Sequence, residues 1–190
     1  MDTLQMTTNR LILRPFEEKD IEALYLLLKD KEVNTFLPWF PMQNISDTKK
    51  FYKEHFKNQK YYFAICLKTD NYPIGYVKAD TADSHDFGYA LNKNFWHKGI
   101  TTEASKALIK QLKKDNIPYI TATHDINNPV SGKVMQNIGM KYCYSYKEQW
   151  QPKDFLVTFR MYQLNLDGQN NRIYQNYWKR YDTHFIEENI

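Results

Sequence analysis

The chain has 190 residues, of which 42% are hydrophobic and 25% are charged, and its formal net charge is +4 at pH 7. A chain of this length buries one sizeable core without a metal or a disulfide, so we expect one α/β domain with a short appendage. No apolar run approaches the ~20 residues that cross a bilayer, and Met1–Thr8 lacks the pattern of a secretory signal. Cys66 and Cys143 lie far apart in apolar settings, which favours buried thiols in a reducing cytoplasm over a disulfide or a redox pair.

Basic residues are interspersed with acidic ones and are densest at Lys49-Lys50, Lys110–Lys114 and Lys179-Arg180. This pattern favours solvated helix faces over a surface that binds nucleic acid, although the surplus positive charge would favour the binding of an anionic ligand. The histidines have no metal-ligand spacing and the cysteines do not join them, so we expect no metal site.

The N-terminal third predicts a strand, two helices and an aromatic loop. Arg10–Arg14 has the alternation of a strand, which Pro15 ends, and Ile21–Leu28 is a strongly apolar helix. Prolines keep the aromatic stretch Phe36–Pro41 out of regular structure. Ser46 is expected to cap the next helix. That helix carries the following residues at the spacing of one face: Phe51, Tyr52, His55 and Phe56.

The middle of the chain predicts strands that later alternate with helices. The expected strands are Tyr61–Leu67, Ile74–Ala79, Phe87–Leu91, Tyr119–Asp125, Lys141–Glu148 and Phe155–Leu164, with a hairpin turn at Asp70–Pro73. The expected helices are Thr101–Lys114 and one that begins at Asn128-Pro129 and closes at Gly139. This order predicts an α/β fold with a mixed, mostly antiparallel central sheet of about six or seven strands and helices on both faces.

The composition shifts from Gly168 onward. Ile173, Tyr177, Trp178 and Tyr181 lie at helical spacing and predict a short docked helix. Its aromatic face either packs on the chain's own domain or forms a contact in a homodimer. We therefore divide the chain into a domain at 7–166 and a C-terminal aromatic helical extension at 167–190.

The segment Phe95–Ala104 joins the end of a predicted strand to an amphipathic helix. Its short loop contains Lys98 and Gly99 and opens directly into the helix. Such a loop offers free backbone N–H groups and the positive end of the helix dipole, which suit a phosphate or pyrophosphate. We therefore expect a phosphorylated cofactor at this loop.

A second motif, Asn128–Met140, follows one helix and one strand later. Asn128 and Ser131 lie one helical turn apart on the same face, near a helix N-terminus. The pair represents either ordinary helix capping or a second wall of the same site.

Four segments, taken in order, resemble the GNAT superfamily of N-acetyltransferases, in its branch of RimJ/RimL-type ribosomal-protein N-terminal acetyltransferases. They are Thr8–Pro15 with Asp20, Leu37–Trp39, Phe87–Ala104 and Asn128–Met140. The resemblance covers about residues 7–166 and implies the GNAT fold, in which two splayed strands form a wedge for acetyl-CoA.

The resemblance implies acetyl-CoA as the cosubstrate. Its pyrophosphate would lie against the loop residues His97, Lys98, Gly99, Ile100, Thr101 and Thr102. Its pantetheine and phosphates would contact Ala90, Leu91, Asn92, Asn128, Ser131 and Lys133. The chain departs from the usual family loop at Trp96, where glutamine or arginine is expected, and at Thr101, which replaces a small residue.

The implied reaction is direct attack of a primary amine on the thioester, with a base that first removes a proton from the amine. Met135 stands where many relatives carry the tyrosine that protonates the departing thiolate, so Ser131 is the implied acid. The favoured base is Glu148 rather than Asp86, and His124 is a secondary candidate. A strand N–H near Leu91 would meet the oxyanion.

The aromatic residues Phe36, Trp39 and Phe40 either line the acceptor mouth or serve as plain loop anchors. The acceptor would be a protein N-terminus or a small-molecule amine such as a polyamine, an amino-acid analogue or an aminoglycoside. The methionine at position 135 motivates an alternative of another class, a non-catalytic acyl-CoA-binding sensor or scaffold.

Overall fold

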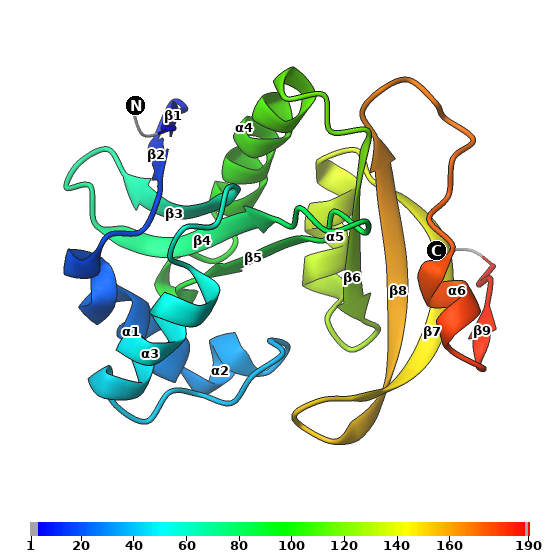
Figure 1. Ribbon diagram of the computed structural model, residues 1–190, viewed down its shortest axis with the longest axis horizontal. Coiled ribbons are helices and arrows are strands. Elements are labelled where there is room, and N and C mark those ends of the chain that lie inside the picture. The colour runs from blue at the N-terminus through cyan, green and yellow to red at the C-terminus, as the bar shows by residue number, and fades with distance from the viewer. Residues whose placement is uncertain (1–3, 189) are drawn as a thin grey trace.

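Figure 1 shows the computed structural model, which describes residues 4–188 and 190. These residues form two antiparallel sheets that lie side by side, with strand orders β1-β2-β3-β4-β5 and β6-β8-β7-β9. The first sheet consists of β1 (Met6–Thr7), β2 (Leu11–Arg14), β3 (Tyr62–Leu67), β4 (Pro73–Ala79) and β5 (Phe87–Leu91). The second consists of β6 (Tyr119–Asp125), β7 (Lys141–Trp150), β8 (Phe155–Asn165) and β9 (His184–Phe185).

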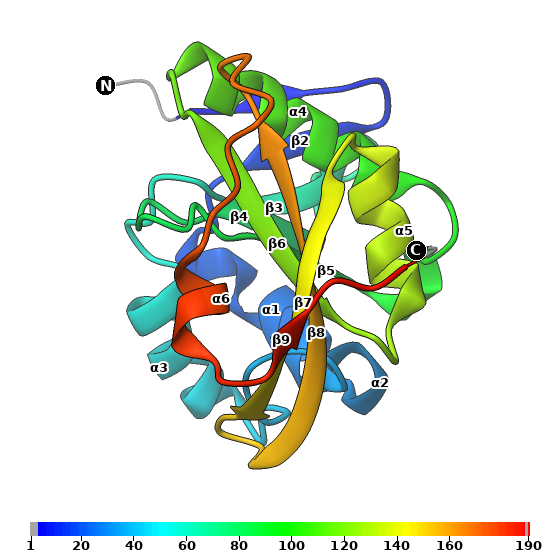
Figure 2. The ribbon, with the colours of Figure 1, turned by 90° about the vertical axis from the view of Figure 1, so that its right-hand side faces the viewer.

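Helices cover both faces of the first sheet (Figure 1). One face carries α1 (Ile21–Lys29), α2 (Lys31–Asn34) and α3 (Ile45–His55), and the other carries α4 (Ile100–Lys114). On the second sheet, α5 (Pro129–Asn137) contacts β6 and α6 (Asn176–Arg180) contacts β7 (Figure 2). Short 3-10 turns occur at Glu18–Asp20 and Lys93–Phe95. Within the described residues, no helix is both long and apolar enough to cross a membrane.

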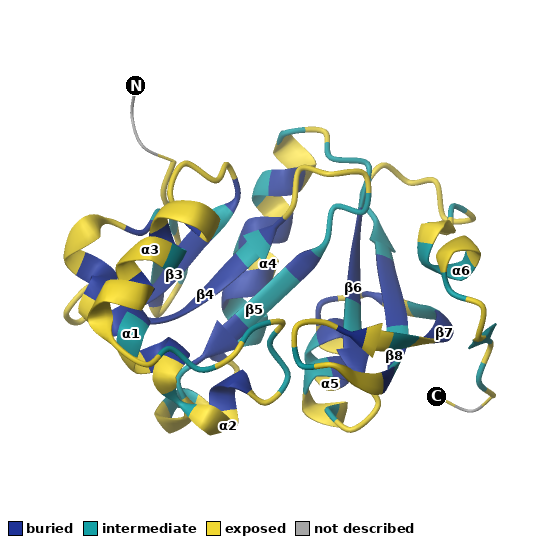
Figure 3. Cartoon of the chain, turned by 60° about the horizontal axis from the view of Figure 1, so that its bottom comes forward, coloured by how far each residue is buried: buried dark blue, intermediate teal, exposed yellow. Residues whose placement is uncertain are grey.

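Three apolar cores follow from this layering. Much of the strand surface between the helices is buried, as Figure 3 shows. The largest core lies between α4, α5 and both sheets, where Leu108 and Leu112 of one α4 face meet Ile120 of β6. The second core lies between the first sheet and α1–α3. In the third, the C-terminal segment packs its aromatic side chains on Tyr144 and Tyr146 of β7. The extension therefore covers a face of its own second sheet.

The two sheets meet along β5 and β6 and then part. A parallel bridge between Asp86, the residue before β5, and Thr121 of β6 joins the two sheets there. The Asn92 N–H donates to the Ile74 carbonyl of β4 at 2.8 Å. Successive N–H groups of a strand point to opposite sides of it. The N–H of Leu91 therefore points away from β4, toward the side on which β6 departs.

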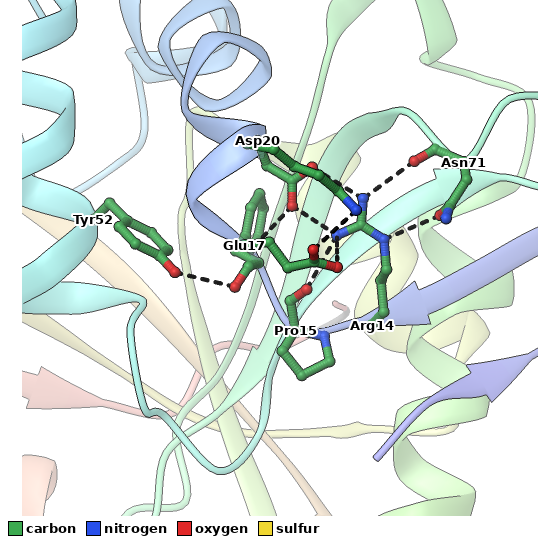
Figure 4. Close-up of polar contacts among 8 residues, drawn as sticks. Arg14, Pro15, Glu17, Asp20, Tyr52 and Asn71 are labelled. Carbon is green, nitrogen blue, oxygen red and sulfur yellow. Dashed lines mark hydrogen bonds and ion pairs between the residues drawn. The ribbon is translucent and has the colours of Figure 1, made fainter. Parts of the chain in front are cut away.

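A buried ion pair anchors the start of the first sheet (Figure 4). Arg14 Nη1 and Nη2 donate to the Asp20 carboxylate at 2.6 and 3.0 Å, and the two side chains are 6% and 4% exposed. Arg14 Nε also donates to Asn71 Oδ1 at 3.0 Å, while Asp20 accepts the Glu17 N–H at 2.8 Å. The hydrogen bond to Asp20 raises the pKa of Arg14. In this chain, the motif Thr8–Pro15 with Asp20 ties β2 to α1 and to the β3–β4 turn.

The structure confirms the predicted α/β class and contains every strand and helix expected up to residue 164. The predicted cap at Ser46 is wrong, because Asn44 caps α3 by accepting the Asp47 N–H at 2.9 Å, and Ser46 already lies inside the helix. The expected single sheet is divided into two, and β1, β9 and α2 are too short to produce a periodic pattern. The C-terminal helix is shorter than its spacing predicts, since the chain turns into β9 after Arg180.

Candidate active site

A cavity of about 1040 Å³ fills the wedge between the two sheets. The predicted site residues that line it are Phe36, Trp39, Asp86, Ala90, Leu91, His97, Lys98, Gly99, Ile100, Thr101, Thr102, Asn128, Ser131, Lys133 and Glu148. Three predicted residues do not line it: Phe40, Asn92 and His124, the last of which is described below. Phe40 is 58% exposed outside the cavity, and the Asn92 side chain accepts the Asn94 N–H at 3.0 Å.

The N-terminus of α4 lies at one end of this cavity. Gly99 precedes the helix in the left-handed conformation, with φ +71°, and provides no side-chain cap. The N–H groups of Ile100, Thr101 and Thr102 find no hydrogen-bond acceptor among residues 4–188 and 190. These free donors and the helix dipole form a site for an anion.

A polar clamp from the β1–β2 turn holds this loop in place. Arg10 Nε donates to Glu103 Oε2 at 2.7 Å, and its Nη1 donates to the Lys98 carbonyl at 2.9 Å. The Thr8 hydroxyl donates to the same carboxylate at 2.6 Å. Burial opposes ionisation of Glu103, but these hydrogen bonds outweigh it and lower the pKa of the carboxyl. The clamp fixes the first turn of α4 against the first sheet.

Trp96, at the position where the family resemblance implies glutamine or arginine, holds the loop in place. Its Nε1 donates to the Leu91 carbonyl at 2.7 Å, so the ring ties the loop to the end of β5. Lys98 Nζ donates to the Asn94 carbonyl at 2.9 Å and lies over the Phe95 ring. Both side chains thus stabilise the loop from which the free N–H groups project.

Tyr89 and Ser131 form a hydroxyl pair where β5 faces α5. The Tyr89 hydroxyl donates to the Ser131 carbonyl at 2.9 Å and lies 3.0 Å from Ser131 Oγ. Burial raises the pKa of Tyr89, so its phenol is neutral at pH 7. Asn128 Oδ1 accepts the Ser131 N–H at 3.3 Å, so the asparagine does cap α5. Sequence reasoning missed Tyr89, whose signal is only its place within a strand.

The two predicted carboxylate bases have different surroundings. Asp86 accepts from Lys78 Nζ at 2.7 Å, and this attraction outweighs burial and raises the pKa of Lys78. Glu148 forms no ion pair with any residue that the structure describes. It lies near Tyr181, whose pKa rises to about 12 through burial and through the neighbouring carboxylate. Glu148 is therefore the carboxylate that remains available for a ligand.

The predicted secondary base, His124, is not in the cavity. It is 4% exposed, and its Nδ1 lies 2.8 Å from the Asp125 carbonyl. Its Nε2 faces Gly132 so closely that a Cβ there would lie 2.6 Å away. Burial lowers the pKa of His124. This histidine is a buried packing residue, because β6 directs it against α5 and away from the wedge. Met135 is also buried, and it lines the cavity.

An aromatic wall, which sequence reasoning did not place in the site, closes the far end of the cavity. It comes from the second sheet and the C-terminal segment: Tyr146, Trp150, Phe159, Tyr177 and Tyr181. Tyr146 stacks on Tyr181 with ring centroids 4.6 Å apart and on Tyr177 at 5.4 Å. The spacing of Tyr177 and Tyr181 predicts a helix face, but only the fold shows that this face reaches the wedge.

The loop after α2 and the β7–β8 hairpin meet beside the same end. Trp39 Nε1 donates to Asn34 Oδ1 at 3.0 Å. Lys153, on the hairpin, donates to the carbonyls of Asn34 and Thr35 at 2.6 and 2.9 Å, and burial lowers its pKa. These contacts join the two sides of the wedge across its opening.

Within the described chain, no three histidine, cysteine, aspartate or glutamate side chains gather as metal ligands. Cys66 and Cys143 are both free thiols, and burial raises the pKa of each to about 11. The groups that line the cavity are backbone N–H groups, hydroxyls, carboxylates, lysine ammonium groups and aromatic rings.

Comparisons with known proteins agree with this geometry. Residues 10–141 match the family described as the acetyltransferase (GNAT) domain. The chain is 30% identical to the uncharacterized N-acetyltransferase YnaD of Bacillus subtilis over 142 residues, which is 73% of this chain and 83% of the relative.

Solved structures share the fold. An acetyltransferase of the GNAT family from Bacillus anthracis has a TM-score of 0.77 and 24% identity, over 86% of this chain and 99% of that chain. RimL, a ribosomal L7/L12 alpha-N-protein acetyltransferase in complex with coenzyme A, has a TM-score of 0.71 and 20% identity. That match covers 85% of this chain and 97% of RimL.

Proposed function

Since this chain belongs to the GNAT acetyltransferase family, we propose that it moves an acetyl group from acetyl-CoA to a primary amine. The observation that carries the proposal is the row of free N–H groups at the start of α4, which opens into a cavity that continues past Ser131 to Glu148. Acetyl-CoA would supply a thioester that an amine can attack directly.

The residues at the α4 end fit the pyrophosphate of such a cosubstrate. The N–H groups of Ile100, Thr101 and Thr102 are unpaired within the described residues, and the absence of a side chain at Gly99 lets a ligand approach the backbone. Lys98 and Lys133 line the same cavity and add positive charge. The Leu91 N–H, which points away from β4, is available to the pantetheine arm.

The proton transfers are assigned to two groups. Ser131 Oγ is the acid for the departing thiolate, and Tyr89, 3.0 Å away, holds this hydroxyl in place. Glu148 is the base for the incoming ammonium, because Asp86 already accepts from Lys78. An amine with a pKa near ~10 is charged at neutral pH, so it must lose a proton before attack.

The test combines calorimetric titration of acetyl-CoA with a thiol-release assay on small amines and peptides. We expect binding and turnover by the wild type, and a loss of about 100-fold in kcat in Ser131→Ala. The matched control is Ser46→Ala, the same change on the exposed face of α3, which should leave kcat unchanged. Acetyl-CoA binding without thiol release for any acceptor, and no effect of Ser131→Ala on binding, would instead assign a non-catalytic acyl-CoA-binding module.

A further inference from the structure

We propose that the C-terminal segment, residues 174–185, forms one wall of the acceptor site and that this wall recognises a small cationic amine. The inference rests on the proposed acetyl transfer and specifies its acceptor. It follows from four observations: the rigid attachment of the segment, its aromatic surface in the cavity, the charge beside that surface, and the enclosure of this end.

The segment is held firmly against the second sheet. At its start, the Tyr174 N–H donates to Gln163 Oε1 at 2.7 Å and the Tyr174 carbonyl accepts the Tyr144 hydroxyl at 2.7 Å. At its end, β9 pairs with β7, and the Lys147 N–H donates to the Thr183 carbonyl at 2.9 Å. A wall fixed at both ends loses little conformational entropy when a ligand binds.

Tyr177 and Tyr181 bring this segment into the cavity. Both rings are half-buried and line it, and Tyr146 of β7 stacks on each of them. The Tyr146 and Tyr181 planes differ by only 7°, with centroids 4.6 Å apart. Stacked phenol rings present an electron-rich face and hydroxyl oxygens, and both attract an ammonium group.

Positive and negative side chains line different parts of the cavity. Lys98 and Lys133 lie on the loop and helix that flank the free N–H groups, where an anion would bind. At the aromatic end, Lys78 is matched by Asp86 at 2.7 Å, so that pair contributes no net charge.

Glu148 lines the aromatic end and has no ion-pair partner within the described residues. The neighbouring cation, Lys153, is not part of the cavity lining, and its Nζ donates to the Asn34 and Thr35 carbonyls and lies over the Trp150 ring. The lining of this end therefore carries an uncompensated carboxylate. A cation is therefore the complementary ligand.

Three chain segments enclose this end and favour a small acceptor over a protein N-terminus. They are the loop at Phe36–Trp39, the β7–β8 hairpin with Trp150, and the C-terminal segment. The hydrogen bonds of Lys153 to the carbonyls of Asn34 and Thr35 lock the first two together. A binding end bordered by three segments, two of them joined by these hydrogen bonds, favours a small amine over an extended peptide.

The experiment measures acetylation kinetics with tyramine, spermidine and a five-residue peptide that has a free N-terminus. We expect at least one of the small amines to have a higher kcat/KM than the peptide. Tyr181→Leu should raise the KM for that amine about tenfold with little change in kcat, because a ring face that attracts the cation is lost. Tyr181→Phe keeps the ring face and should stay within about threefold of the wild type.

The control for a general disturbance of the segment is Trp178→Leu. Trp178 lies in the same segment as Tyr181, on α6, but it contacts Tyr144 and His184 and does not line the cavity. An equal rise in KM in this variant, an unchanged KM in Tyr181→Leu, or a preference for the peptide would each overturn the inference. Failure of the proposed acetyl transfer is detected separately, as the absence of thiol release with all three acceptors or the absence of acetyl-CoA binding in calorimetry of the wild type.

Discussion

The two ends of the cavity are built from different kinds of groups. At the α4 end, free backbone N–H groups face the cavity, and side chains such as Arg10 and Trp96 hold the loop in shape. At the other end, the rings of Tyr146, Tyr177 and Tyr181 form the surface themselves. A site made of backbone tolerates changes in sequence, which explains how the loop retains its geometry despite Trp96 and Thr101. A surface made of side chains changes its shape and charge with each substitution, so such a surface can be adapted to one acceptor.

The two halves of the molecule also differ in how they are stabilised. The first sheet is anchored by the buried pair of Arg14 and Asp20, whereas the second depends on aromatic rings that a terminal segment covers. The four predictions that follow probe this contrast, from the largest expected effect to the smallest.

Truncation after Leu166 should have the largest effect. It uncovers Tyr144 and Tyr146, whose burial alone contributes about 3–6 kcal/mol to the free energy of unfolding. We expect a lower unfolding midpoint, measured by circular dichroism, and self-association in sedimentation velocity. A truncated chain that stays monomeric and equally stable would mean that the second sheet does not need its cover, and the boundary at residue 166 would then mark a dispensable tail.

Asp20→Ala should lower the free energy of unfolding by about 3–5 kcal/mol, because it leaves the Arg14 guanidinium buried and unpaired. The matched control is Arg10→Ala, which breaks the pair with Glu103. The Arg10 side chain is 45% exposed, so we expect a loss below about 1 kcal/mol. Urea denaturation measures both. Equal losses would show that burial does not distinguish the two ion pairs.

The same contrast explains what could be predicted from the sequence. Strands, helices and the α4 loop depend on local signals, namely periodicity, prolines and a glycine before a helix, and these are readable without the fold. The predicted family is confirmed by the match of residues 10–141. It was predictable because four motifs in a fixed order along the chain are more specific than any one of them. The contact between Tyr181 and Glu148 depends instead on how the C-terminal extension folds back over β7. The two residues are more than thirty positions apart in the sequence, so no local pattern encodes this contact.

His124 and Asn44 show the limits of local signals in another way. A histidine at a strand end is a reasonable base, but β6 turns it toward Gly132, and a sequence does not reveal that contact. Asn44 and Ser46 are both good capping residues, and the extended backbone at Asn44 decides between them. Packing decides the role of His124, and the backbone conformation decides the cap of α3.

Gly99→Asp tests the backbone-built end. The position has φ +71°, and an aspartate would place a negative charge beside the free N–H groups of α4. We expect acetyl-CoA affinity to fall by at least about 100-fold, which is about 2.7 kcal/mol, with the fold intact by circular dichroism. Gly168→Asp is the control, because Gly168 also has a positive φ, of +83°, but lies at the start of the C-terminal extension with open space around it. Unchanged affinity in Gly99→Asp would remove the loop from the proposed cosubstrate site.

The smallest effect is a pH dependence at the end of the C-terminal segment, which tests whether its polar attachment matters beside its aromatic packing. Glu187 accepts from Arg160 Nε at 3.0 Å and from the Ser145 hydroxyl, and the Arg160 hydrogen bond lowers the pKa of Glu187 from its ordinary 4.5. A carboxyl group whose pKa is lower in the folded state than in the unfolded state stabilises the fold. This stabilisation is fully present above the pKa of the unfolded state and is lost as the pH falls through the pKa of the folded state. Glu187→Gln should therefore be less stable than the wild type at pH 7, by under about 1 kcal/mol, and this gap should close as the pH falls below 4.5. The exposed neighbour Glu188 gives the matched control, since Glu188→Gln removes the same charge without this ion pair. If the gap for Glu187→Gln were the same at pH 7 and pH 3, the charge of Glu187 would contribute nothing to the attachment of the extension.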